Sequence, residues 1–216
     1  MRANIASCII IVCAVAGALT FPASAATAPI DYLSLEAEVY AYGEGYFEGE
    51  PAWMEDVETG GLLTEFPIEA GVGLLELPVA GAVQDTQLDQ FGFSSSSLCE
   101  GEYVSVDSFS WASSSLWIQF TLEEQTAFSL DGEIDGEGSY AFSGPGIDQS
   151  GTSGPFSLSG ILSAGTYQFS IDIIAGLDGG PSTSMFSVAF VIPGPGALPL
   201  LLAAAWRGRG LRRRRR

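Results

Sequence analysis

Apolar and polar residues alternate in short stretches through the middle of the chain, which is the pattern of half-buried strands. The clearest stretch runs from Tyr32 to Tyr40, where Ser and Glu alternate with apolar residues. Residues 62–68 and 72–79 are two further apolar runs with prolines near their ends, which predicts strands closed by turns. Residues 43–61 are crowded with carboxylates and predict a solvated acidic loop. The alternative for this segment is a cation-binding lobe that exposes Trp53.

A Phe-Ser pair recurs six times in the second half of the chain, at intervals of 13 to 19 residues. Each interval suits one strand and one turn. Glycine and proline clusters between the pairs predict turns, and residues 26–190 have no sustained helical period. The sequence therefore predicts an all-β fold, an antiparallel β-sandwich that is jelly-roll-like. The six pairs begin at Phe109, Phe128, Phe142, Phe156, Phe169 and Phe186.

Residues 1–25 have the composition of a secretory signal peptide. Arg2 precedes an apolar run over residues 9–19, and the small residues Ala23 and Ala25 mark the expected cleavage site. A second small-residue site at residues 26–28 leaves the cleavage point open. Residues 26–190 then form one acidic β-sandwich body, because about 165 residues are enough to bury a core.

The last segment, residues 191–216, contains a Pro-Gly-Pro turn, a short apolar run and a basic end. The apolar run over residues 197–206 would be about 15 Å long as a helix, about half the hydrocarbon core of a bilayer. Arginines resist transfer across a membrane and are expected on its cytoplasmic side. The segment therefore predicts a temporary stop-transfer helix whose tail is later removed. The turn and the terminal basic cluster consist of Pro193, Gly194, Pro195, Arg212, Arg213, Arg214, Arg215 and Arg216.

This order of turn, apolar helix and arginine cluster resembles the PEP-CTERM sorting signal of Gram-negative bacteria. Pro193 and Pro195 match the family motif, and Gly194 stands where the family has Glu. The resemblance implies recognition by an exosortase-type enzyme in the inner membrane, transient anchoring there, and removal of the tail. It further implies delivery to the cell surface, the outer membrane or the extracellular matrix.

The predicted body carries no basic side chain. The whole chain has 8 Lys and Arg against 26 Asp and Glu, and every basic residue lies at position 2 or within residues 207–216. Salt bridges between side chains of the body are therefore excluded, and repulsion by phosphates excludes nucleic acid as a partner. Divalent cations or a salty medium are the expected compensation. Cys99 is the one cysteine of the body and predicts a buried thiol, since the chain has no His to activate it.

Carboxylates at alternate positions make residues 131–138 the best candidate for a metal site. Asp131, Glu133 and Asp135 resemble the front of a calcium loop, since Ca²⁺ takes about six to eight oxygen ligands. Phe142 stands where an EF-hand has its last Glu, so the segment is no EF-hand. Backbone carbonyls or Asp148 would have to close a Ca²⁺ site. A polar hairpin turn without metal is the alternative.

The missing His and Lys argue against an enzyme, because the usual general bases are then absent. A glycosidase needs only two carboxyl groups, and Glu100 with Glu102 is one pair that could serve. Glu123 and Glu124 are disqualified as a facing pair, because neighbouring residues on a strand point to opposite faces.

Four aromatic residues offer stacking faces for sugar rings and keep a carbohydrate-binding module, with extracellular polysaccharide as its partner, as the alternative function. Trp111 and Trp117 would share a face if one uninterrupted strand carried both, but a turn between them fits the sequence equally well. Core packing is the favoured use of these rings. The sequence thus predicts an exported, non-catalytic structural protein of the cell surface or extracellular matrix. The four residues are Trp53, Tyr103, Trp111 and Trp117.

Residues 162–167 read Leu-Ser-Ala-Gly-Thr-Tyr. This run resembles the penultimate hairpin of many secreted bacterial β-sandwiches, including pre-peptidase C-terminal domains. Such domains bind or stabilise and do not catalyse, so the resemblance implies a hairpin at this point and a binding or structural role.

Overall fold

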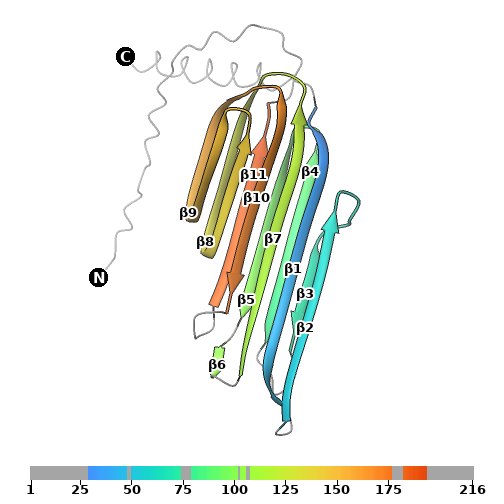
Figure 1. Ribbon diagram of the computed structural model, residues 1–216, viewed down its shortest axis with the longest axis vertical. Coiled ribbons are helices and arrows are strands. Elements are labelled where there is room, and N and C mark those ends of the chain that lie inside the picture. Colours follow the sequence, from blue (N-terminus) through green and yellow to red (C-terminus); the bar gives the residue numbers. More distant parts are fainter. Residues whose placement is uncertain are drawn as a thin grey trace, which may run out of the picture.

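The computed structural model describes residues 29–47, 50–73, 79–101, 103–105, 108–176 and 182–193. Within these ranges every regular element is a β-strand (Figure 1). The prediction of an all-β, antiparallel fold is confirmed. No helix in the described ranges has the length and hydropathy needed to cross a membrane. The strands are β1 (Asp31–Phe47), β2 (Glu50–Gly61), β3 (Ile68–Val72), β4 (Ala80–Asp89), β5 (Gly92–Gly101), β6 (Tyr103–Ser105), β7 (Ser108–Leu122), β8 (Thr126–Gly144), β9 (Ile147–Leu162), β10 (Gly165–Ala175) and β11 (Ser182–Val191).

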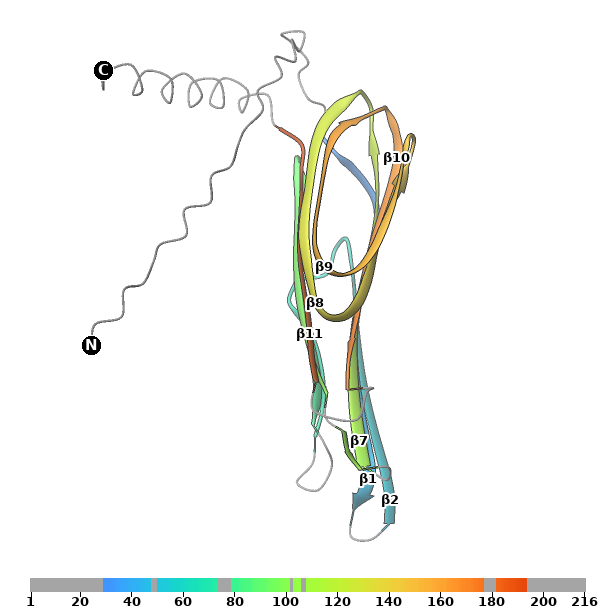
Figure 2. The same ribbon diagram turned by 90° about the vertical axis from the view of Figure 1, so that its left-hand side faces the viewer.

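The strands form one continuous antiparallel sheet that folds back on itself and is nearly closed. Its order is β2-β1-β7-β10-β8-β11-β5-β4-β3, with β6 beside β7 and β9 beside β8. We call β2, β1, β7 and β10 the front wall, and β11, β5, β4 and β3 the rear wall. Figure 2 shows the two walls edge-on, facing each other across the core. Strand β8 connects them.

The sheet extends one residue beyond the predicted end of the body, and the next residue is still hydrogen-bonded to the rear wall. Strand β11 ends at Val191, and the N–H of the buried Ile192 donates to the carbonyl of Phe91 at 2.8 Å. The predicted signal peptide, including Ala23 and Ala25, and the tail from Gly194 onward lie outside the described residues.

Strand β8 passes from the rear wall to the front wall at a bend around Gly136. Its first half pairs with β11, its second half pairs with β10, and β9 follows it along the outer edge. The pairing with β9 shifts register between Ile134 and Ser139. Gly136 has a φ of 95°, which residues with a Cβ rarely adopt. The segment 131–138, for which a polar hairpin turn was the alternative to a calcium site, is not a hairpin turn but a bend inside one strand, because glycines permit bulges as well as turns.

Two other segments are more regular than the sequence predicts. The acidic segment 43–61 is not a loop: it forms the end of β1 and the whole of β2, paired as a long hairpin. Exposed carboxylates suit the solvated face of an antiparallel pair as well as they suit a loop. Phe128 and Phe142 both lie in β8, so the interval between these two Phe-Ser pairs contains no turn.

Two segments are less regular than predicted. Residues 62–67, which make up most of the first apolar run, connect β2 to β3 and are not a strand. The strand begins at Ile68 and ends at Val72. Residues 162–167 are not a hairpin, because β9 pairs with β8 whereas β10 pairs with β7 and β8. The connection is a crossover between strands that are not neighbours. The hydroxyl of Tyr167 fastens it by donating to the carbonyl of Ser163 at 2.8 Å.

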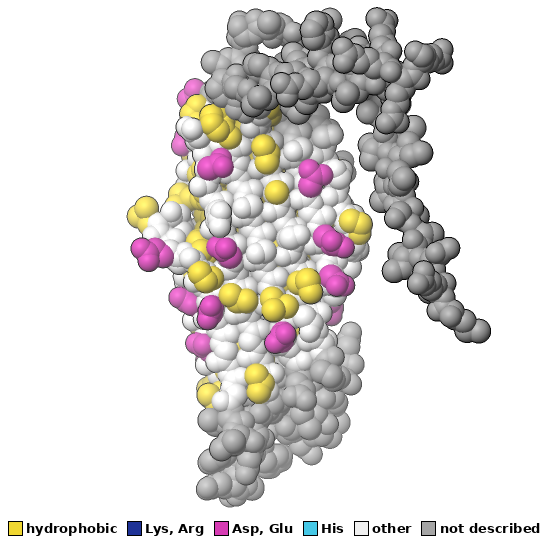
Figure 3. All heavy atoms as spheres, turned by 180° about the vertical axis from the view of Figure 1, so that it is seen from behind, with side chains coloured by type: hydrophobic (Ala, Val, Ile, Leu, Met, Phe, Trp, Pro, Cys, Tyr) yellow, Lys and Arg dark blue, Asp and Glu magenta, His cyan; other side chains and the backbone are white. Residues whose placement is uncertain are grey.

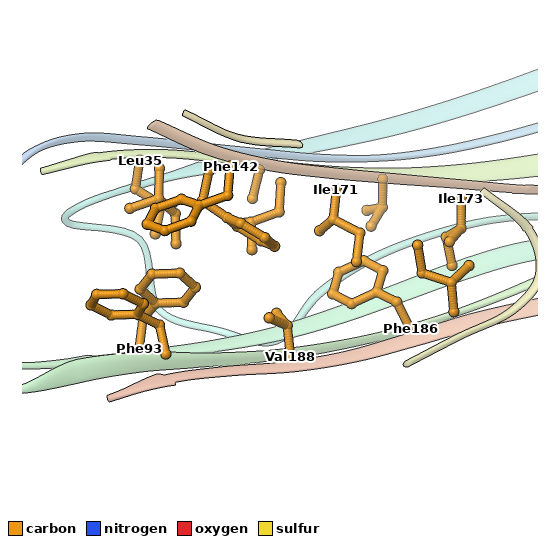
Figure 4. Close-up of a cluster of buried hydrophobic side chains, with 14 of the residues drawn as sticks. Leu35, Phe93, Phe142, Ile171, Ile173, Phe186 and Val188 are labelled. Carbon is orange, nitrogen blue, oxygen red and sulfur yellow. The ribbon is translucent and has the colours of Figure 1, made fainter. Parts of the chain in front are cut away.

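Aromatic side chains fill one half of the core. Phe120 of the front wall is fully buried, and its ring centroid lies 5.0 Å from that of Phe190 and 6.5 Å from that of Phe142. Phe93 stacks on Phe190 at 5.3 Å. Figure 4 shows side chains of the two walls pointing toward one another, with Phe142 and Ile171 on one side and Phe93 on the other. The aromatic cluster thus holds the two walls apart in this half.

Small side chains become frequent toward the other end of the core, which we call the thin half. The inward positions of β7 in this half are Ser110, Ala112 and Ser114, all buried. The walls meet through their backbones at its end, since a Cβ built on Gly176 would lie 3.1 Å from the Cα of Gly101. Glycine is needed at both positions because no side chain fits between the walls.

One buried hydrogen bond joins the two walls inside the thin half. Ser114 Oγ of β7 donates to Gln84 Oε1 of β4 at 2.9 Å. Gln84 Nε2 donates in turn to Thr86 Oγ1 at 3.3 Å, and the Thr86 hydroxyl shares a bond with Ser95 Oγ at 2.8 Å. All four side chains are buried and polar. They cost little to bury because each has a partner.

Ser114→Ala is expected to lower the free energy of unfolding by about 1–3 kcal/mol, because it leaves the buried Gln84 oxygen without its cross-wall donor. Urea denaturation followed by fluorescence would measure the change. Ser113→Ala, at the neighbouring outward position of the same strand, is the control and should change stability by less than about 0.5 kcal/mol. Equal losses in the two variants would contradict a stabilising role for the cross-wall bond.

Two carboxylates close the seam between the edge strands β2 and β3. Glu58 Oε2 accepts a hydrogen bond from the N–H of Glu69 at 2.8 Å, and Asp56 Oδ2 accepts one from the N–H of Gly71 at 2.9 Å. Both donors belong to β3, whose other edge pairs with β4. The carboxylates thereby occupy edge amides that would otherwise be open to a strand of another molecule.

Candidate binding face

Three of the four aromatic residues singled out in the sequence lie on the outer face of the front wall, the face toward the viewer in Figure 1. Trp111 and Trp117 share this face because β7 runs without interruption from Ser108 to Leu122. Trp53 of β2 is 64% exposed. The prediction that these rings pack in the core is therefore wrong. Tyr103 lies in β6, and its side chain is not described.

The tryptophan on the thin half belongs to a cluster of four rings, which we call the aromatic ladder: Tyr40, Tyr42, Phe109 and Trp111. The rings of Tyr40 and Trp111 are stacked, with centroids 4.7 Å apart and an interplanar angle of 29°. Tyr42 lies 6.3 Å from Trp111 and 6.1 Å from Phe109. Sequence reasoning missed the two tyrosines, although their alternation with the inward Val39 and Ala41 places them on the outer face.

Carboxylates flank the aromatic ladder. The Tyr42 hydroxyl donates to Glu44 Oε2 at 2.8 Å, and the Tyr40 hydroxyl donates to Glu55 Oε2 at 3.4 Å. The hydrogen bond to Glu44 is the main cause that raises the pKa of Tyr42. Desolvation, followed by the charge of Glu55, raises the pKa of Tyr40. Both phenols are therefore neutral at physiological pH, and the ladder is apolar at its centre and anionic at its rim.

A shallow groove crosses the front wall beside the aromatic ladder. It consists of two adjoining hollows of about 550 and 570 Å³, which share the lining residues Glu38 and Ser115. Trp117 lines the second hollow. The floor follows one row of the sheet, with a single residue from each of five neighbouring strands. We call this feature the transverse groove, and its row is Thr59, Glu38, Ser115, Asp172 and Ser139, from β2, β1, β7, β10 and β8 in that order.

The groove runs at right angles to the strands. Neighbouring strands lie about 4.8 Å apart, so a row of five spans about 19 Å. On β7, Ser113 and Ser115 are the only outward residues between the two tryptophans. These small side chains leave the floor low between Trp111 on one side and Trp117 on the other. The groove is therefore long enough for an extended chain molecule.

Asp172 is the carboxyl group at the centre of the groove. Its register partners are Ser115 on one side and Ser139 on the other. Burial raises the pKa of Asp172, so its ionised form is less well solvated here than in water. The side chain is nevertheless exposed, so the carboxyl group is open to a ligand.

The predicted calcium ligands lie elsewhere, on the outer side of β8. Asp131, Glu133 and Asp135 are all exposed and occupy every second position of the strand, which separates successive Cα atoms by about 6.6 Å. Asp131 Oδ1 accepts a hydrogen bond from Ser157 Oγ at 2.6 Å. Asp148 pairs with Ser143, eight residues beyond Asp135 along β8, and does not close around the same ion. Among the described residues no group of three or more acidic, His or Cys side chains is arranged to hold a metal, and the calcium site stays a prediction.

The other acidic residues and the cysteine singled out in the sequence do not come together in one site. Glu100 lies on β5 of the rear wall, whose outer face carries scattered carboxylates (Figure 3), and Glu102 is outside the described residues. Glu123 and Glu124 lie at bends in the connection from β7 to β8, not on a strand as the sequence argument assumed. Burial raises the pKa of the Cys99 thiol to about 12, so it is unreactive at neutral pH.

No protein-family model matches this chain, and no curated protein matches it.

Proposed function

We propose that the protein is an exported, non-catalytic structural component of the cell surface or extracellular matrix, sorted by an exosortase-type enzyme. The observation that carries the proposal comes from the sequence: Pro193-Gly194-Pro195, an apolar run and an arginine cluster follow one another after a body that has no basic residue of its own. Cleavage of the tail would convert a precursor with one basic end into a purely acidic molecule. During sorting the tail would anchor the protein transiently in the inner membrane.

In this proposal the body is an antiparallel, jelly-roll-like β-sandwich. The front and rear walls are its two sheets, and β8 is the strand that belongs to both. A signal peptide over residues 1–25 precedes it, and a short hydrophobic sorting helix follows it. An extracellular location suits a fold whose acidic side chains point into a salty medium.

The intact mass of the protein recovered from the cell surface tests the sorting proposal. The mature chain is expected to begin after Ala25 and to end near Pro195. Recovery of exported protein with all C-terminal arginines would contradict processing by an exosortase-type enzyme. Pro193→Ala with Pro195→Ala should leave the tail in place, whereas Leu200→Ala, which keeps both prolines, serves as the control.

A second candidate function is a carbohydrate-binding module. The specific observation in its favour is that Trp53, Trp111 and Trp117 lie on one outer face, where aromatic rings are available for stacking on sugars. A glycan array probed with the mature protein tests this function. Binding that is lost in Trp111→Ala and Trp117→Ala would support it, and an array without any bound polysaccharide would contradict it.

A further inference from the structure

We infer that the transverse groove binds one uncharged, extended glycan chain that lies across the strands, with Trp117 on one side and the aromatic ladder on the other. This inference rests on the carbohydrate-binding candidate and goes further by naming the site, the direction of the chain and the class of glycan. It does not depend on whether the tail is processed.

The shape of the groove carries the first step. Its row of five residues contains three hydroxyl side chains, Thr59, Ser115 and Ser139, and two carboxylates. Low side chains on the floor and tryptophans one or two outward positions away would let a glycan chain lie flat while its ring faces contact indole rings. The span of about 19 Å accommodates several sugar rings in a row.

The chemistry of the floor carries the second step. Glu38 and Asp172 flank Ser115 on its two neighbouring strands, so two carboxylates and a hydroxyl stand side by side. Carboxylates accept hydrogen bonds and donate none. Their natural partners in a neutral ligand are hydroxyl groups, which sugars present along both edges of each ring. Such bonds to a charged acceptor are stronger than those between neutral groups.

Charge selects the class of glycan. Residues 3–206 contain no Lys, Arg or His, so the groove has no positive side chain to receive a uronate or sulfate group. Glu36, Glu38, Glu137 and Asp172 all line the two hollows and repel anions. A neutral polysaccharide is therefore accepted, and an acidic one is rejected.

The position of Asp172 in the groove gives the last step. Asp172 is exposed, lines the first hollow and stands between the hydroxyl-bearing Ser115 and Ser139. Hydroxyl groups of a bound glycan can donate to this carboxylate at the centre of the floor. A residue kept for binding and not for stability has a testable signature: Asp172→Asn should weaken binding without lowering the melting temperature.

A basic peptide is the other macromolecule that carboxylates attract. The rings on both sides of the floor favour a ligand with flat apolar faces, which a sugar ring presents and a lysine side chain does not. Glycan is therefore the occupant to test first, with oligolysine as the probe for the other outcome.

Isothermal titration of the mature chain tests the inference, with hexasaccharides of a β-glucan, a β-mannan and a β-galactan as neutral probes and oligogalacturonate as the acidic probe. Binding of a neutral probe is expected, with no binding of oligogalacturonate. Asp172→Asn and Trp117→Ala should each weaken binding by about tenfold or more. Met185→Ala, an exposed apolar residue on the rear wall, is the matched control and should bind as the parent does.

Each remaining outcome contradicts a distinct statement. Neutral glycan binding that survives in both groove variants but is lost in Trp53→Ala would overturn the groove and leave the carbohydrate-binding function standing. No binding of any neutral probe would overturn both. Salt-sensitive binding of oligolysine that Asp172→Asn abolishes, without glycan binding, would assign the groove to a basic partner. A lower melting temperature for Asp172→Asn would make the residue structural.

Discussion

Phe120→Ala is expected to lower the free energy of unfolding by about 3–5 kcal/mol, a large part of the stability of a domain of this size. Phe120 is fully buried, and the ring centroids of Phe190 and Tyr167 lie 5.0 and 5.7 Å from its own. Tyr32 and Phe93 are each 6.4 Å away. The substitution would therefore open a cavity at the point where rings of both walls meet.

Chemical denaturation of the mature body would measure this loss. Phe109→Ala is the matched control: it removes the same ring from the same strand, but from the outer face, where the nearest described ring partner is Tyr42 at 6.1 Å. We expect it to cost about 1 kcal/mol or less. A loss for Phe120→Ala no greater than that for Phe109→Ala would show that the aromatic cluster does not stabilise the packing between the two walls.

The fold class could be predicted because strand periodicity is a local property. The alternation in residues 32–40 and the regular recurrence of Phe-Ser both correspond to strands. The bend of β8 could not be predicted, since glycines at 136 and 138 read as a turn when the partner strands are unknown. Only the pairing of β8 with both β10 and β11 makes that segment a passage between walls.

The aromatic residues of the candidate site were found in the sequence, but their face was assigned wrongly. On β7 the inward positions change from Ser110, Ala112 and Ser114 to large apolar residues further along the strand. Alternation with the apolar Leu116 and Ile118 already places Trp117 on the outer face, whereas the small Ser110 and Ala112 beside Trp111 give no such contrast. In the thin half the walls come too close for an indole ring, so Trp111 lies outside.

The small residues inside the thin half and the aromatic residues on its outer face are thus related. Where the walls converge, the inside of β7 holds small residues and the outside holds Phe109 and Trp111. Where the walls separate, the ring of Phe120 is inside and the polar side chains of Gln119 and Thr121 are outside. The partners of the groove row, Asp172 and Ser139, come from strands more than 20 residues away. Sequence reasoning gave no signal for that juxtaposition.

Gly176→Ala is expected to lower the free energy of unfolding by about 4 kcal/mol or more, or to prevent folding, since two costs combine at this position. Gly176 has a φ of 98°, and an added Cβ would collide with the carbonyl oxygen of Ser110 and lie 2.8 Å from the Cα of Trp111. Both obstacles are backbone atoms of the front wall, which cannot rotate away. The effect would be seen as a lower urea midpoint or a lower yield of folded protein.

Two further glycines separate the two costs. Gly154 has a φ of 116° with no atom within 4 Å of an added Cβ, so Gly154→Ala should cost only the backbone strain of about 1–2 kcal/mol. Gly101 lies outside the left-handed region, yet its added Cβ would lie 2.8 Å from the carbonyl oxygen of Ala175. Gly101→Ala should therefore lose stability through contact alone. If Gly101→Ala, whose added Cβ would meet the opposite wall, left the stability unchanged, the walls would have room between them, and the close approach that places Trp111 outside would be wrong.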